Sequence, residues 1–167
     1  TTPSSYTING TLNGIYTVGA TGTYPTLTAA VADYNVKCLT GPVTFSLIDA
    51  SYSAAETFPI VVQPNPSASS TNTLTIKPAA GVSPVISGLA ASTTVFVLNG
   101  ADFVTIDGSN TVGGTTRDLT FRNINTTTNG VVTVWVASQG ANAGATNNKI
   151  LNSIIEGPAP GTSTLVG

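Results

Sequence analysis

The chain has 167 residues, of which 7% are charged, and it contains seven acidic residues, five basic residues and no histidine. Soluble domains usually carry about a quarter charged residues, so a helical bundle with a charged surface describes this sequence poorly. The basic residues stand singly along the chain, which excludes the basic patch that binds nucleic acid or an anionic membrane surface.

One segment near the N-terminus, residues 26–34, is predicted to be a helix. The i, i+3, i+4, i+7 spacing of one apolar helix face is met by Leu27, Ala30, Val31 and Tyr34. Pro25 and Thr26 suit the start of a helix, since both residue types are common around the first turn. We therefore expect a short amphipathic helix that buries one face.

The remaining chain alternates short β-rich runs with turns of Gly, Asn or Pro. The predicted strands are residues 15–18, 43–48, 60–62, 74–77, 85–87, 94–98, 103–107, 119–124, 131–136 and 149–156. This pattern predicts an all-β protein with a single helix.

Similar strands recur in the same order, which favours a solenoid over a sandwich of two sheets. Three pairs of segments are alike: 74–77 and 119–122, 95–97 and 134–136, and 103–108 and 152–157. They predict two coils of a three-sided helix, with a third coil beginning at residues 164–166. Asparagines at the strand ends fit the tight turns of such coils, but a sandwich also places Asn there and stays the alternative.

The composition also indicates the cellular location of the protein. Hydroxyl and amide side chains, rather than Lys and Glu, make this surface polar, which suits an extracellular or cell-surface protein. No apolar run approaches the ~20 residues of a membrane-spanning helix, so we expect no membrane insertion. Cys38 is the single cysteine, which excludes an intrachain disulfide, and we expect it to be buried. We interpret the start, Thr-Thr-Pro-Ser-Ser, as an end left after removal of a signal peptide.

Four segments taken together resemble a known family: residues 22–31 (Gly-Thr-Tyr-Pro-Thr-Leu-Thr-Ala-Ala-Val), 41–45 (Gly-Pro-Val-Thr-Phe), 73–78 (Thr-Leu-Thr-Ile-Lys-Pro) and 103–108 (Phe-Val-Thr-Ile-Asp-Gly). They resemble the N-terminal part of right-handed parallel β-helix proteins of the pectate-lyase superfamily. The greatest similarity is to the β-helix region of large secreted and cell-surface, adhesin-like proteins of Bacteroidetes-type bacteria. The resemblance implies that the helix at 26–34 caps one end of the solenoid.

The predicted fold is therefore an all-β, right-handed parallel β-helix, a three-sided solenoid with one N-terminal capping α-helix. Residues 1–41 hold the N-terminal strands and the helix, and residues 42–167 hold the coils, within a single domain. We expect the coils to continue beyond residue 167, because the predicted third coil would otherwise leave an open sheet edge.

Several kinds of catalysis are excluded because the chain has no histidine. A Ser-His-Asp triad, a Cys-His dyad and an imidazole metal ligand all require that residue. The resemblance implies lyases that use acidic calcium ligands with an Arg or Lys base, and esterases that use an Asp pair. The candidates form no lyase signature: Asp107, Arg117, Asp118, Arg122 and Lys149. The esterase motifs are missing, and we predict no catalytic residue.

Two acidic residues suggest a calcium site. Asp107 and Glu156 each follow an apolar pair and precede a glycine, so the repeat alignment places them on neighbouring coils ~4.8 Å apart. That spacing suits a calcium ion or a pair of catalytic carboxylates. The alternative is that each carboxylate accepts hydrogen bonds from the turn at its following glycine. No other cofactor is expected.

Two aromatic residues are candidates for ligand contact. If alternation buries the neighbouring valines, Phe96 and Trp135 face outward and stack on adjacent coils, as in surfaces that hold a sugar ring or a neighbouring domain. If the alternation is the opposite, so that the neighbouring valines face outward, both rings fill the core.

The expected function is that of an extracellular structural or adhesive β-helix module of a bacterial surface protein. Its partners would be other domains of the same protein, further copies of itself in a filament, or polysaccharide. The alternative is a fragment of a polysaccharide lyase or hydrolase.

Overall fold

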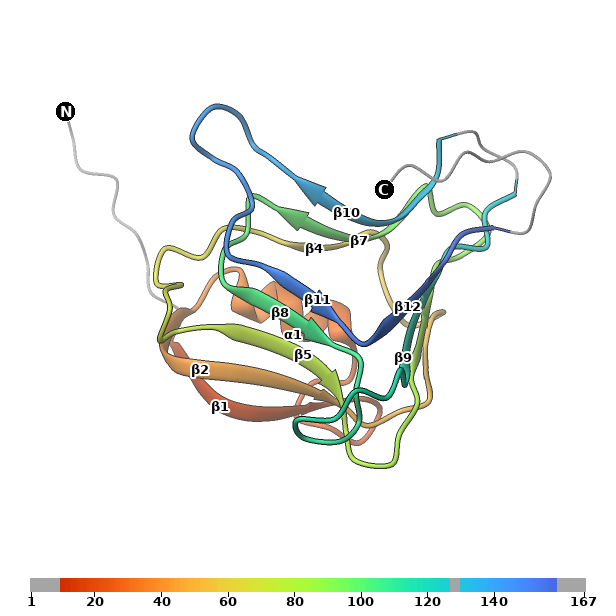
Figure 1. Ribbon diagram of the computed structural model, residues 1–167, viewed down its shortest axis with the longest axis horizontal. Coiled ribbons are helices and arrows are strands. Elements are labelled where there is room, and N and C mark those ends of the chain that lie inside the picture. Colours follow the sequence, from red (N-terminus) through yellow and green to blue (C-terminus); the bar gives the residue numbers. More distant parts are fainter. Residues whose placement is uncertain (1–9, 127–129, 159–167) are drawn as a thin grey trace.

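Strands from successive turns of the chain lie side by side in the computed structural model, which describes residues 10–126 and 130–158 (Figure 1). Every pairing between the described strands is parallel. The protein is thus an all-β parallel β-solenoid of about three turns with one short helix. The predicted solenoid is confirmed, and a sandwich built from antiparallel hairpins is not what forms.

The described strands make three sheets. A five-stranded sheet contains, in spatial order, β1 (Thr11–Val18), β2 (Cys38–Leu47), β5 (Leu74–Pro78), β8 (Val104–Asp107) and β11 (Lys149–Leu151). A four-stranded sheet contains β3 (Ser51–Tyr52), β6 (Val85–Ser87), β9 (Leu119–Arg122) and β12 (Ser153–Glu156). A three-stranded sheet contains β4 (Ile60–Val62), β7 (Thr94–Asn99) and β10 (Val132–Ala137).

From β2 onward the chain visits the five-stranded, four-stranded and three-stranded sheets in turn. Consecutive strands therefore belong to different sheets, and each strand pairs with its counterpart one turn away. In the five-stranded sheet, Phe45 is the register partner of Ile76, and Ile76 that of Ile106. All three side chains are fully buried, so the core is a stack of equivalent apolar residues.

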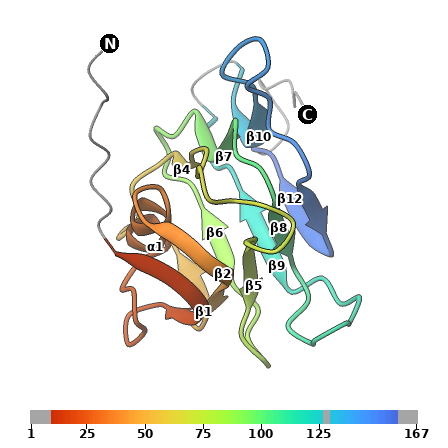
Figure 2. The ribbon, with the colours of Figure 1, turned by 90° about the vertical axis from the view of Figure 1, so that its left-hand side faces the viewer.

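The helix α1 (Leu27–Tyr34) follows β1. It takes the place in the first turn that a strand of the three-stranded sheet takes in later turns. Thr26 caps it, since its side chain accepts a hydrogen bond from the Ala29 N–H (3.0 Å). The four residues of the predicted apolar face are all buried, which confirms the predicted helix. Figure 2 shows α1 near β1 at one end of the solenoid, with β10 and β12 at the other.

The chain after α1 covers the edge of the three-stranded sheet. The Asn35 Nδ2 donates to the Val61 carbonyl (2.9 Å), and the Asn35 Oδ1 accepts from the Gln63 N–H (2.9 Å). One side-chain amide thereby satisfies the backbone groups that a further strand beside β4 would pair with. We call this covered side, formed by α1 and Asn35, the capped end.

Two local expectations differ from the structure. Residues 149–156 form two strands, because Asn152 has a positive φ of 51° and turns the chain into the next sheet. Cys38 is partly exposed rather than buried. The boundary expected at residue 41 falls inside β2, and the third coil expected at residues 164–166 lies outside the described residues.

The repeat alignment was wrong for two of its three pairs. Residues 74–77 lie in the five-stranded sheet, whereas residues 119–122 lie in the four-stranded sheet. In the same way, residues 103–108 contribute a strand to the five-stranded sheet and residues 152–157 contribute one to the four-stranded sheet. Residues 95–97 and 134–136 do share a sheet, but the predicted match is one residue out of register, because Phe96 and not Val95 is the partner of Val134. Turns of different length let similar tetrapeptides recur on different sides of the solenoid, so likeness between strands does not identify equivalent positions.

Tyr34 points from α1 into the core, and its hydroxyl has no hydrogen-bond partner among the described residues. We expect Tyr34→Phe to leave the free energy of unfolding unchanged or to raise it by up to about 1 kcal/mol, because it removes an unsatisfied buried polar group. Urea unfolding measures the difference.

Tyr52→Phe is the matched control for Tyr34→Phe. The Tyr52 hydroxyl donates to the Val18 carbonyl (2.5 Å) and accepts from the Asp49 N–H (3.1 Å). Its removal should lower the free energy of unfolding by about 1–2 kcal/mol. An equal loss in both variants would show that the Tyr34 hydroxyl has a partner after all.

The buried tyrosines should make the stability of the fold depend on pH in the alkaline range. Burial raises the pKa of Tyr34 and of Tyr52 to about 12, above the value of about 10 for a tyrosine in an unfolded chain. The folded state therefore holds these protons more tightly, and its stability is retained below pH ~10 and lost between pH ~10 and ~12. In an alkaline titration, the phenolate absorbance of these residues should appear together with the loss of circular dichroism. Complete phenolate formation near pH ~10 in a folded protein would contradict this prediction.

Candidate functional site

The end of the solenoid opposite the capped end carries the last described strand of each sheet: β10, β11 and β12. Each pairs on one side with a strand of the preceding turn, and no described strand pairs with its other side. Three strand edges without a strand partner among the described residues thus lie at the same end of the solenoid (Figure 1).

Core positions become exposed at this end. Val136, Ile150 and Ile155 are the register partners of Leu98, Ile106 and Phe121. The partners in the preceding turn are fully buried, whereas Val136 is 50% exposed and Ile155 is 45% exposed. These side chains have the core orientation, but no further turn among the described residues covers them.

The exposed side chains line a hollow of about 750 Å³. Its apolar lining includes Val132, Val134, Trp135, Val136, Ile150 and Ile155. We call the four inward-facing residues Val134, Val136, Ile150 and Ile155 the open-end surface. Apolar side chains beside free strand edges are suited to the addition of further β-structure.

The predicted aromatic pair is separated by the register. Phe96 pairs with Val134, and Trp135 pairs with Val97, so the two rings are one position apart and point to opposite faces. Phe96 is fully buried and its ring lies 5.4 Å from that of Phe121, while Trp135 is 53% exposed. The prediction that both rings stack on the outer face is therefore wrong, and so is the alternative that both rings fill the core.

The predicted calcium pair is also separated. Asp107 is the partner of Leu151 in the five-stranded sheet, and Glu156 is the partner of Arg122 in the four-stranded sheet. The expectation that the two carboxylates occupy equivalent positions on neighbouring coils is wrong, because the chain changes sheets at Asn152. Among the residues that the structure describes, no three acidic, Cys or His side chains gather as a metal site.

Each carboxylate has a local partner. The Asp107 Oδ1 accepts from the Ser109 N–H (3.1 Å) and from the Asn152 Nδ2 (2.9 Å), so it stabilises the turn that follows β8. The Glu156 Oε2 accepts from the Arg122 Nε (2.6 Å) on the adjacent strand, in a half-exposed ion pair. Such exposed ion pairs contribute little to stability.

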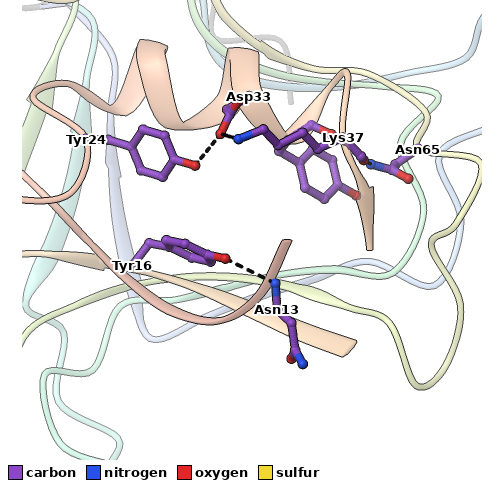
Figure 3. A network of polar contacts seen from close by, with 7 residues as sticks. Asn13, Tyr16, Tyr24, Asp33, Lys37 and Asn65 are labelled. Atoms are coloured by element: carbon purple, nitrogen blue, oxygen red, sulfur yellow. Dashed lines mark hydrogen bonds and ion pairs between the residues drawn. The ribbon is translucent and has the colours of Figure 1, made fainter. Parts of the chain in front are cut away.

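Sequence reasoning missed a polar network that fastens the capped end (Figure 3). The Tyr24 hydroxyl donates to Asp33, whose carboxylate also binds the Lys37 ammonium (2.6 Å). Burial, together with the Asp33 carboxylate, raises the pKa of Tyr24. The Asn65 amide donates to the Tyr34 and Lys37 carbonyls (2.7 and 2.8 Å), which satisfies backbone groups at the end of α1.

Glu56 satisfies the opposite end of α1. It is 6% exposed, and its carboxylate accepts from the Leu27 N–H (2.8 Å), the Thr28 N–H (2.7 Å) and the Thr28 hydroxyl (2.5 Å). An acid at a helix N-terminus is a common stabilising arrangement. Glu56 lies 29 residues after Leu27 in sequence, so no local motif could have identified it.

In the part of the chain that the structure describes, no helix is long and apolar enough to cross a membrane. Searches with protein-family models, among curated proteins and among solved structures find no match for this chain. The features of the described residues that bear on function are the geometry of the two ends of the solenoid and the exposed ring of Trp135.

Proposed function

We propose that this chain is part of an extracellular structural solenoid of a bacterial surface protein, and that its open-end surface is covered by a further coil of the same polypeptide. In this proposal the solenoid is right-handed and three-sided, as in the pectate-lyase superfamily that the sequence resembles. The observation that carries the proposal is a contrast between the two ends. At the capped end, α1 and Asn35 cover the edge of the three-stranded sheet, and the core residues of α1 are buried. At the other end, core residues of all three sheets are exposed among the described residues.

Strand order supports a coil of the same polypeptide over a second copy. The chain enters the five-stranded sheet at β11 and the four-stranded sheet at β12, so the next strand in this rotation joins β10 in the three-stranded sheet. Such a strand is parallel to β10, as in every pairing described here. A second copy stacked by twofold symmetry would bring antiparallel strands to the same edges, and stacking onto a capped end is blocked by α1.

The proposal is tested by the size of the natural protein and by protection of the open end. We expect denaturing mass spectrometry of the natural product to give a mass well above the 16.8 kDa of these residues. In a Cys38→Ser background, Ile155→Cys should react readily with a maleimide in the 167-residue chain and be protected in the longer product. Ile15→Cys, at a 75% exposed position on β1, should react in both. A natural mass equal to that of this chain, or equal labelling of Ile155→Cys in both forms, would overturn the proposal.

The adhesive part of the proposal concerns Trp135, which is exposed on the outer face of β10. An exposed aromatic ring can stack on the apolar face of a sugar. Titration with soluble glycans should shift the emission of Trp135, the single tryptophan of the chain. No shift across a broad glycan panel would limit the function to a structural one. Calcium-dependent release of unsaturated products from acidic polysaccharides would instead replace it with a lyase.

A further inference from the structure

The sequence contains four Asn-Gly pairs, at residues 9–10, 13–14, 99–100 and 129–130. An asparagine followed by glycine is chemically labile, because the glycine nitrogen has no side chain beside it to hinder attack on the asparagine amide. Residues 9 and 129 lie outside the described residues. The structure therefore allows a comparison of two pairs, Asn13-Gly14 and Asn99-Gly100, each of which is preceded by a leucine.

Asn13 lies in an irregularity of an edge strand. β1 is the outermost strand of the five-stranded sheet, and its register with β2 shifts between Leu12 and Gly14, so Asn13 has no partner on β2. Gly14 has a φ of +93°, a conformation that favours glycine. The Asn13 side chain is exposed, and its amide has no hydrogen bond with the described residues. Its backbone N–H donates to the Tyr16 hydroxyl (3.2 Å; Figure 3).

At Asn99, hydrogen bonds hold both groups that would react, the side-chain amide and the nitrogen of Gly100. Its Nδ2 donates to the Gln63 Oε1 (3.0 Å), and its carbonyl accepts from the Gln139 Nε2 (3.0 Å). The Gly100 N–H, which would have to attack, donates to the Ala137 carbonyl (2.8 Å). Asn99 also belongs to β7, the central strand of its sheet, so reaction there requires local unfolding.

We propose that Asn13 is a site of spontaneous deamidation in the folded protein, whereas Asn99 is protected. The Gly14 nitrogen attacks the Asn13 Cγ and loses its proton, the Cγ–Nδ2 bond breaks, and ammonia leaves, which produces a cyclic succinimide. Water then opens either carbonyl of the ring and gives aspartate or isoaspartate at position 13. No oxidant, reductant or enzyme is required.

The product changes the edge of the solenoid beside Gly41. A Cβ on Gly41 would lie 2.4 Å from the Asn13 Oδ1, so the two strands are in close contact at this point. Isoaspartate adds one methylene to the backbone of β1 and a negative charge to its surface. We therefore expect the amide protons around the modified position to exchange faster with solvent after the reaction.

The test compares the two sites in the 167-residue chain, folded and unfolded. The protein is incubated at mildly alkaline pH with and without denaturant, and peptide mass spectrometry follows deamidation at Asn13 and Asn99, with isoaspartate confirmed by enzymatic methylation. In the folded protein we expect Asn13 to react at least about tenfold faster than Asn99, because the Gly100 and Asn99 hydrogen bonds must open first. In denaturant the two rates should be similar, since both sites have the same flanking Leu and Gly.

Asn13→Gln should abolish the early deamidation and leave the rate at Asn99 unchanged. Equal rates at the two sites in the folded protein would overturn the proposal, as would an Asn13 that stays intact while the unfolded chain reacts. This inference does not depend on the proposed function, because it concerns the edge of β1 and not the open-end surface.

Discussion

Phe96→Ala is expected to lower the free energy of unfolding by about 3–5 kcal/mol. Phe96 is fully buried in the central strand of the three-stranded sheet, and its ring packs edge-on against that of Phe121 across the core. Loss of the ring leaves a cavity bounded by strands of two sheets, which close packing prevents from collapsing. Denaturant unfolding monitored by circular dichroism measures the change.

Trp135→Ala is the matched control, since it also removes an aromatic ring from the same sheet, one register position away. The Trp135 side chain is 53% exposed, so the expected loss is much smaller, about 1 kcal/mol or less. Similar losses in the two variants would contradict the register that places these rings on opposite faces.

Glu56→Ala is expected to lower the free energy of unfolding by about 3 kcal/mol, because it leaves the N–H groups of Leu27 and Thr28 without their acceptor. The carboxylate joins the segment between β3 and β4 to the start of α1, so its loss should loosen the capped end first. Hydrogen exchange of the α1 amides and equilibrium unfolding together measure both effects.

Glu156→Ala provides the control for loss of a glutamate. Its carboxylate is paired with Arg122 at the surface of the last turn, and the expected change is about 1 kcal/mol or less. If Glu56→Ala changed stability as little as Glu156→Ala, the carboxylate of Glu56 would not be the principal cap of α1. Faster exchange throughout the solenoid, without preference for α1, would contradict the local role.

The two ends of the solenoid differ in the chemistry of their side chains. At the capped end, polar side chains from distant parts of the chain satisfy the helix ends and one sheet edge: Asn35, Glu56 and Asn65. At the other end, the residues of the open-end surface keep the apolar character of the core. Among the residues described, polar side chains therefore cover one end of the solenoid, while apolar core side chains are exposed at the other.

Local periodicity in the sequence predicted the helix and most of the strands, whereas the parallel solenoid was predicted from recurring strand types and from the family resemblance. The helix at 27–34 and strands such as 60–62 and 85–87 occur where the pattern places them, because the 3.6-residue and two-residue periods of apolar side chains are properties of short segments. The two-residue strand β3 was missed because a segment that short has no measurable period.

Only the tertiary structure decided which strands are neighbours and in what register. The sequence showed that alternate residues of a strand share a face, but a shift of one residue exchanges the faces, and this shift separates Phe96 from Trp135. Likewise, the positive φ of Asn152 moves Glu156 to a different sheet from Asp107. Register, sheet membership and capping depend on contacts between residues far apart in the chain. The sequence by itself therefore determined the helix and most strands and indicated a solenoid, while the fold determined which strands are equivalent and which side chains meet.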